Sequence, residues 1–441
     1  MFPPITKPTN SNFKLDSKSF SLAEKVLYWT IVLTPLWWLL GIQTLFYPAV
    51  IVGLLVISFD WNHILETPIP VAVWAWLAMA VTMLWTALFG LSDIGFDLMK
   101  TAATLVTFFK GYFLIFACLL LPFGTRIRIE VITRAVVWMA IGYLVVISLQ
   151  LVMLYGGIQI RPIMPPLAKF TPGNPLSLIV KLTASWKPFF GITVPRSALY
   201  MPDPPIPGIC GLLALIICCG ESQTKLRKLA IAGCLAAILI SQSRLAWVCL
   251  PIAITILATF RTFWARQMTL WLFSLTALFA SFLELTFKDL LQKPWAVFNK
   301  ARPSSTTDRA FVVAKTLEAW RESPWLGWGI TQDTANWYTY EIALGSFSTY
   351  AAVLYLHGIV GFIVFIIALA TTLVSLWQIA LEDNILGKRA FAGLIVLYLF
   401  IQGLPLSWIT VYIWYFFIWL GAVMATNNRK QDVTSQWNYL F

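Results

Sequence analysis

The sequence predicts an all-α membrane protein that crosses the bilayer many times. Of its 441 residues, 59% are hydrophobic and only 11% are charged, whereas a soluble domain of this length carries about a quarter charged residues. Its 22 Trp and 14 Tyr suit a chain with many membrane–water interfaces, where amphipathic rings are favoured. The six cysteines all lie in apolar segments without metal-ligand spacing. We therefore expect neither a disulfide framework nor a zinc site. We also expect no other metal, no cofactor and no nucleic-acid partner.

Apolar segments of about 17–25 residues are long enough to cross a bilayer as helices. The chain contains about twelve of them, and their boundaries are least sharp where two segments follow each other almost without a loop. The expected spans are 26–42, 43–59, 70–90, 101–121, 131–155, 204–219, 228–243, 245–262, 268–287, 349–376, 389–406 and 408–426.

The orientation of these spans follows from their short loops, because short loops that are rich in Lys and Arg favour the cytoplasmic side. The N-terminal segment carries four lysines and lacks the apolar core and cleavage site of a signal peptide, so both termini are expected in the cytoplasm. The expected units are a tail 1–25, spans 26–287 with an outer loop at 156–203, a large outer loop 288–348, spans 349–426, and a tail 427–441.

The two outer loops carry most of the remaining cations, and the positive-inside rule does not govern long loops. Solvated loops near anionic headgroups would explain any single one of these residues. Two cationic loops on one side of a helix bundle also suit an anionic substrate that is met at the outer leaflet. The candidate substrate-binding cations are Arg196, Arg302, Lys315 and Arg321.

An arginine stands between two apolar runs in ILISQSRLAWVCLPI, which contains Arg244. An arginine at membrane depth is costly and usually faces a cavity or a partner. The alternative is an arginine that reaches out from a tight outer turn. The hydrogen-bonding residues Ser241, Gln242 and Ser243 before it suit either a turn or a phosphate-binding pocket.

The second loop contains an amphipathic helix in SSTTDRAFVVAKTLEAWRESPWLGWG, which starts at Ser304. Apolar residues recur there with helical spacing after Thr306, Thr307 and Asp308, which are residue types that cap helix starts. Arg309 is then expected in the first turn, where the helix dipole disfavours a cation. Contact with a bound anion would explain it, and so would an exposed arginine that costs little.

A proline-rich stretch, VPRSALYMPDPPIPGICG, leads into the sixth expected span and carries Arg196 and Asp203. Irregular backbone at membrane depth is tolerated only where it is buried or lines a cavity. The two charges would therefore line a site, or they would pair with each other in a rigid loop.

Together these segments resemble the O-antigen ligase and O-antigen polymerase superfamily, most clearly from about residue 190 to 365. The resemblance rests on the pair Ser243–Arg244 at a span boundary and on the outer-loop helix that ends in PWLGWG. It also rests on the stretch GSFST (residues 345–349), which leads into a span with a Gly-x-x-Gly pattern.

The resemblance implies a GT-C-type membrane glycosyltransferase of the bacterial plasma membrane. Such an enzyme takes a glycan from an undecaprenyl diphosphate carrier, without a metal, and joins it to a glycan or lipid acceptor. Other polysaccharide assembly proteins are then further partners. Arg244 and Arg309 match family arginines and would stabilise charge on the leaving diphosphate. Ser348 and Tyr350 would face the substrate at the mouth of the next span.

One position departs from the family pattern, which commonly has histidine where this chain has Phe347. His357 lies ten residues later, about 15 Å deeper along a regular helix, and is not expected to replace it. Three readings stay open: another base such as Asp203, Asp333 or Glu341, an inactive chain, or a diverged role.

Two other classes of function also remain. An anion transporter would show inverted repeats and a midplane site, and the two halves of this chain show no clear pairing. A non-catalytic component of a polysaccharide export complex would fit the absence of histidine at Phe347. Within the resembled family, the GSFST stretch favours a polymerase over a ligase.

Overall fold

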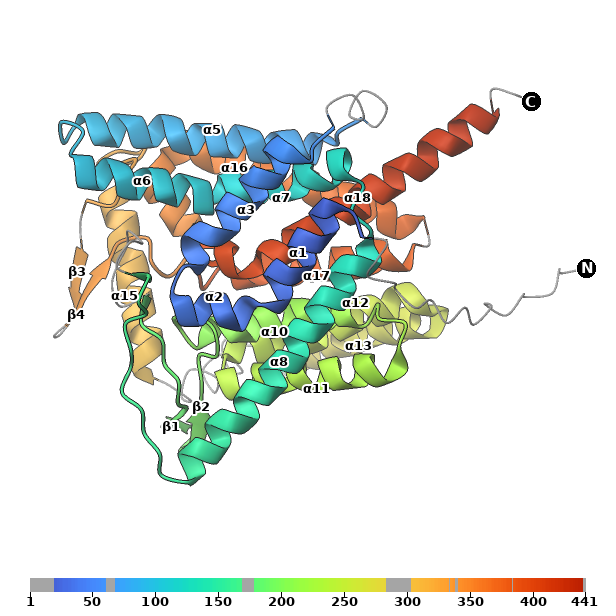
Figure 1. The fold of residues 1–441 in the computed structure, drawn as a ribbon, viewed down its shortest axis with the longest axis horizontal. Coiled ribbons are helices and arrows are strands. Elements are labelled where there is room, and N and C mark those ends of the chain that lie inside the picture. Colours follow the sequence, from blue (N-terminus) through green and yellow to red (C-terminus); the bar gives the residue numbers. More distant parts are fainter. Residues whose placement is uncertain are drawn as a thin grey trace, which may run out of the picture.

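The computed structural model describes residues 20–60, 68–168, 178–282, 303–332, 334–337, 340–382 and 384–438, and helices dominate it (Figure 1). The helices before residue 156 are α1 (Leu22–Val32), α2 (Thr34–Leu40), α3 (Gln43–Ile57), α5 (Val71–Ser92), α6 (Leu98–Lys110), α7 (Tyr112–Thr125) and α8 (Ile129–Tyr155). The later helices are α10 (Pro205–Cys218), α11 (Thr224–Ser241), α12 (Arg244–Arg261), α13 (Phe263–Phe282), α15 (Pro303–Trp320), α16 (Thr349–Leu381), α17 (Ile385–Phe400) and α18 (Leu406–Asn438). The strands are β1 (Ser185–Phe189), β2 (Ile192–Arg196), β3 (Thr334–Trp337) and β4 (Tyr340–Ala343).

Every expected span overlaps one or two of these helices. Within the described residues, six helical stretches are long and apolar enough to cross a membrane: α5, the pair α6–α7, α8, α12, α16, and α18 as far as Arg429. The helices α3 and α10 are apolar but shorter. The fold is therefore that of a helical membrane protein, and the count of twelve spans stays a prediction.

The helix α18 forms the centre of the bundle. All its residues from Ile409 to Ala425 are buried, as expected of a helix that is apolar all round and enclosed by others. It packs most extensively against α7, while α5 packs against α16 and α8 packs against α11. The loop before α18 is partly enclosed: Ile401, Leu404 and Pro405 are buried, Gly403 is half-buried and Gln402 is exposed.

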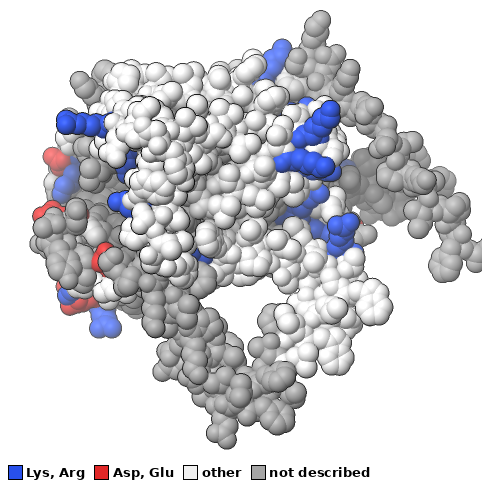
Figure 2. Space-filling model, turned by 90° about the horizontal axis from the view of Figure 1, so that it is seen from below, with Lys and Arg blue, Asp and Glu red and all other residues white. Residues whose placement is uncertain are grey.

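Charged side chains gather at two opposite ends of the molecule, with a broad uncharged band between them on the face drawn in Figure 2. At the end that contains the C-terminus of α18, Arg128 Nε lies 2.7 Å from Glu24 and Arg134 Nε lies 2.6 Å from Glu221. Both glutamates are buried, so each needs its cationic partner. These pairs join loops that the sequence analysis places together in the cytoplasm.

The two long loops form small β-hairpins, which the sequence analysis did not predict. Phe189 pairs with Ile192, so Phe190 and Gly191 make a two-residue turn between β1 and β2. Both turn residues have positive φ, 50° and 80°, as a type I′ hairpin turn requires. The strands β3 and β4 form a second antiparallel pair beside α15 (Figure 1). The predicted all-α class holds for the bundle, to which the loops add these hairpins.

The helix α16 reverses sharply at Gly358, where φ is 61° and ψ is −165°. The ring centroids of Tyr350 and Phe365 lie 6.1 Å apart, whereas 15 residues of regular helix would separate them by about 22 Å. The first leg, residues 349–357, therefore folds back beside the second leg. The expected span 349–376 is not one continuous helix, and the distance inferred for His357 along a regular helix does not apply.

The segment Pro324–Gly329 occupies this reversal and bonds to the backbone groups that it frees. Gly358 has no side chain to obstruct it: a Cβ there would lie 2.1 Å from the Trp325 carbonyl oxygen. The hydrogen bonds run from Trp328 N to Tyr355 O (2.9 Å), Gly329 N to Leu356 O (2.8 Å), Ile359 N to Pro324 O (2.9 Å) and Val360 N to Trp325 O (3.2 Å). The loop that carries α15 is thus fixed to the bundle.

Candidate functional site

Arg309 lies on α15, although not in the turn that the sequence predicted. The helix begins at Pro303, because proline is well tolerated at the first helical position, where its missing N–H has no partner to lose. Arg309 is therefore in the second turn, and the prediction of a first-turn cation is wrong. Its position has to be explained by the contacts of its side chain.

Three groups surround the Arg309 guanidinium. Its Nη1 donates to the Gly403 carbonyl oxygen at 3.1 Å, and its central carbon lies 5.1 Å from the centroid of the Phe347 ring. Burial lowers the pKa of Arg309, and the negative charge of nearby Asp203 raises it in part. Among the described residues, Gly403 is its one hydrogen-bond acceptor, which leaves most of the five guanidinium donors for a ligand.

The GSFST stretch is fixed against the loop between α17 and α18, the same loop that contains Gly403. Thr349 N donates to the Ile401 carbonyl oxygen at 2.9 Å. The Thr349 hydroxyl donates to Leu404 O and accepts from Leu406 N, both at 2.7 Å. These bonds fix the backbone two residues after Phe347, whose ring contacts Arg309.

Ser348 and Tyr350, predicted to contact substrate, have structural partners here. Ser348 is buried and caps α16, accepting from Ala351 N at 3.4 Å. The Tyr350 hydroxyl lies 3.5 Å from the Tyr398 carbonyl oxygen. Their role toward a substrate stays a prediction.

Arg196 and Arg244 meet at the turn between α11 and α12. Arg196 Nε donates to Ser241 O at 3.3 Å, and Gln242, which has a φ of 49°, donates to Pro195 O at 3.0 Å. Ser243 caps α12 with its hydroxyl, which accepts from the backbone of that helix. Arg244 follows as the first helical residue and is half-buried.

This turn also lies close to Arg309. The Cβ position of Gly403 is 3.6 Å from Arg309 Nη1 and 3.6 Å from a methyl carbon of Leu245. The structure therefore brings together the three segments that the sequence singled out, which carry Arg244, Arg309 and Asp203. Asp203 is half-buried just before α10.

Other predicted residues lie outside this group. Lys315 pairs with Glu318 at 2.7 Å on the exposed side of α15, and Arg321 and Glu341 are also exposed. Arg302 and Asp333 fall outside the described residues. Trp325, in the segment that follows α15, is 68% exposed.

Sequence reasoning missed the role of His357, which is buried beside the reversal of α16. Its Nδ1 lies 2.6 Å from the Thr86 hydroxyl, which has carbonyl acceptors at Thr82 (3.0 Å) and Met83 (3.1 Å). His357 thus joins α5 to the first leg of α16.

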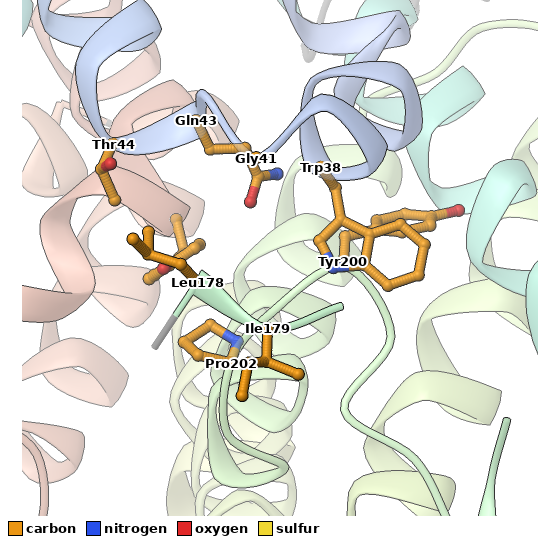
Figure 3. Close-up of a pocket in the computed structure, with 9 residues that line it drawn as sticks. Trp38, Gly41, Gln43, Thr44, Leu178, Ile179, Tyr200 and Pro202 are labelled. Carbon is orange, nitrogen blue, oxygen red and sulfur yellow. The ribbon is translucent and has the colours of Figure 1, made fainter. Parts of the chain in front are cut away.

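A small pocket is lined by Pro202, the residue before Asp203 (Figure 3). In Figure 3 the side chains of Trp38 and Gln43 face Ile179 and Pro202 across it. Among the described residues, the Thr44 hydroxyl is buried without a hydrogen-bond partner, which suits a bound water or a ligand hydroxyl. The lining residues are Trp38, Gly41, Gln43, Thr44, Leu178, Ile179, Tyr200, Pro202 and Tyr412.

Comparison with known families gives one match. Residues 229–366 match the family model described as O-antigen ligase, whereas no curated protein matches the chain. The matched range contains Arg244, Arg309, Phe347 and the reversal at Gly358, and it stops short of Gly403. This match confirms the resemblance inferred from the sequence, within the part of the chain where that resemblance is clearest.

Proposed function

We propose that this protein is a glycosyltransferase that moves a glycan from an undecaprenyl diphosphate carrier to a hydroxyl of a second glycan at the outer face of the plasma membrane. The family match supports an O-antigen ligase-like or polymerase-like activity. The observation that carries the finer proposal is the placement of Arg309, which contacts Gly403 and Phe347 and lies within electrostatic reach of Asp203.

The arginines would hold the donor diphosphate. Arg309 offers a planar fork of N–H donors that matches phosphate oxygens. In this proposal Arg196 and Arg244 add two more cations from the neighbouring turn, whose Leu245 lies beside Gly403. Negative charge grows on the diphosphate as the bond to the sugar breaks. Fixed cations in a partly dry site stabilise that charge more in the transition state than in the ground state.

We assign to Asp203 the role of the general base that deprotonates the acceptor hydroxyl. Phe347 cannot take a proton, and Glu341 lies on the exposed side of a hairpin, whereas Asp203 is within electrostatic reach of Arg309. In the proposed step the Asp203 carboxylate takes the proton of the acceptor hydroxyl, whose oxygen attacks the anomeric carbon. The bond from that carbon to the phosphate oxygen breaks, and its electron pair leaves with the diphosphate. A single displacement of this kind inverts the anomeric configuration.

We favour polymerisation over ligation because the GSFST stretch is closer to the polymerase pattern. A polymerase lengthens a glycan that stays on the carrier, so its products form a ladder of repeat units. A ligase gives one product on a lipid acceptor. Supplying a carrier-linked glycan or a lipid acceptor, and identifying the product that forms, therefore distinguishes a polymerase from a ligase.

A non-catalytic role in a polysaccharide export complex is the second candidate, and the observation that favours it is Phe347 at the usual histidine position. The test is glycan transfer by the purified chain in liposomes from an undecaprenyl diphosphate-linked oligosaccharide. We expect the unaltered chain to transfer glycan, and Phe347→His to be no more than a few-fold faster. Transfer seen only with Phe347→His would show that histidine is the missing base, and would contradict the role of Asp203.

No transfer by either form, with polymer and lipid acceptors both supplied, would favour the non-catalytic role. Solute uptake by the same liposomes would instead indicate a transporter. Arg266→Ala is the matched control, because Arg266 is an exposed arginine whose guanidinium carbon lies 5.9 Å from the Phe263 ring centroid. It reproduces the stacked pair away from the site.

A further inference from the structure

Lys110 lies at a break inside a membrane-spanning stretch. The apolar stretch Leu98–Thr125 is long enough to cross a membrane, and Lys110 is the last residue of α6 within it. Gly111, with φ −94° and ψ −123°, separates α6 from α7. An ionisable side chain at such a position is costly, and it usually faces a cavity or a partner.

Neighbouring contacts place this break at the level of the GSFST stretch. The ring of Tyr112 lies 6.0 Å from the ring of Phe365, and Phe365 lies 6.1 Å from Tyr350 on the other side. The Cβ position of Gly111 is 3.5 Å from Ser407 Cβ, one residue after the Leu406 amide that bonds to Thr349. Phe365 is seven residues, or about 10 Å of helix, past the reversal at Gly358.

The protein provides no counter-ion for this lysine among its described neighbours. Lys110 is partly buried, and no hydrogen bond or ion pair within the described residues reaches its ammonium group. The helices packed against α6 are α3, α5, α7 and α18. None of them contains Asp or Glu, apart from a single aspartate in α18 beyond Arg429.

We propose that Lys110 binds a phosphate oxygen of the lipid-borne donor, as a second cation that reaches the carrier from the bundle side. The proposal rests on the proposed function, since the donor is the anion that would supply the missing negative charge. An ammonium group is a compact point charge that binds phosphate without fixed geometry. Lys110 would thus draw the lipid diphosphate to the level of Phe347, while Arg309 reaches it from the outer loop.

The headgroup of an ordinary anionic phospholipid could also supply the phosphate oxygen, so the experiment compares the carrier lipid with a phospholipid. Binding of undecaprenyl diphosphate and of phosphatidylglycerol is measured by native mass spectrometry, for the unaltered chain and for Lys110→Met, Lys110→Arg and Lys100→Met. Lys100 is the matched control, because it is an exposed lysine near the start of the same helix. Melting temperature checks folding, and removal of an unpaired charge should leave it unchanged or raise it.

We expect Lys110→Met to weaken binding of undecaprenyl diphosphate about tenfold or more, as loss of a charge-assisted hydrogen bond does. Lys110→Arg should restore most of it, and Lys100→Met should bind like the unaltered chain. Undiminished diphosphate binding by Lys110→Met would overturn the proposal, and so would a loss confined to phosphatidylglycerol.

Transfer assays separate this proposal from the proposed function. Lys110-dependent binding without any glycan transfer would leave the anion site standing and defeat the transferase. Normal transfer and a normal donor KM in Lys110→Met would leave the transferase standing and overturn the role of Lys110.

Discussion

The guanidinium of Arg309 stacks on the ring of Phe347, with 5.1 Å between the guanidinium carbon and the ring centroid. Arg309 comes from α15 and Phe347 from the stretch before α16, 38 residues later. The loop of Gly403, which accepts from Arg309, also accepts from the backbone and hydroxyl of Thr349. Phe347 therefore contacts a cation at the position where the resemblance leads us to expect histidine.

Loss of the Phe347 ring should weaken donor binding without unfolding the protein. Phe347→Leu keeps an apolar side chain in the small cluster around Val312 but removes the ring face. A cation–π contact contributes about 0.5–1 kcal/mol at partly exposed sites, so the donor KM should rise about two- to fivefold. Phe263→Leu removes the corresponding ring beside Arg266 and should change nothing. An unchanged KM in Phe347→Leu would mean that the stack is incidental.

Asp203→Asn should slow the chemical step and spare donor binding. A positioned general base contributes about 10²–10⁴-fold, and asparagine keeps the shape of the side chain while losing its basicity. We expect kcat to fall within that range while binding of the diphosphate carrier stays within a few-fold. Glu322→Gln, on the exposed surface of the same outer region, serves as the control. Full activity in Asp203→Asn would remove Asp203 from the mechanism.

Gly358→Ala should be strongly destabilising. A Cβ at Gly358 would lie 2.1 Å from Trp325 O and 2.6 Å from Leu326 N, and the positive φ adds strain. We expect a loss of at least about 3 kcal/mol, measured by thermal unfolding in detergent. Gly53→Ala is the comparison, because Gly53 lies inside α3 with open space around its Cβ position; it should be neutral or stabilising by about 0.5–1 kcal/mol. Similar melting of both variants would contradict the reversal.

Acidification should lower the folding stability of the protein through Glu221, which lies outside the membrane spans. Burial raises the pKa of Glu221, but hydrogen bonds from Arg134 and from Gln223 N outweigh it, so the pKa lies below its ordinary value. A lowered carboxylate pKa gives stability that is present above the unfolded pKa of about 4.3 and is lost as pH falls through the folded pKa. Glu221→Gln should melt lower at pH 7 and lose less on acidification. Glu130→Gln is the control at an exposed glutamate, and its melting temperature should fall on acidification as much as that of the unaltered chain.

Much of the fold follows from local sequence patterns. Long apolar runs predict the membrane helices, and helical spacing after Asp308 predicts most of α15. The three charged segments could also be associated, because their motifs share one family pattern. These features depend on residues close together in the chain, which is why the sequence alone suffices for them.

The features that the sequence did not reveal depend on partners far apart in the chain. Gly358 in LHGIVGF looks like a helix-packing glycine, and only the bonds from Trp328 and Gly329 make a reversal stable there. Gly403 contributes a carbonyl oxygen, which no side chain signals. The start of α15 was placed too late because Thr306 and Thr307 are capping types, whereas Pro303 begins the helix.

The most direct test of the central claim is the donor dependence of glycan transfer by Arg309→Ala, Arg309→Lys and the control Arg266→Ala in liposomes. If Arg309 binds the diphosphate and stabilises it as it leaves, Arg309→Ala should lower kcat/KM by about 10²-fold or more. Arg309→Lys should recover part of that loss, and Arg266→Ala should match the unaltered chain. Equal kcat/KM in Arg309→Ala and Arg266→Ala would contradict the account, because the stacked arginine would then have no part in the reaction.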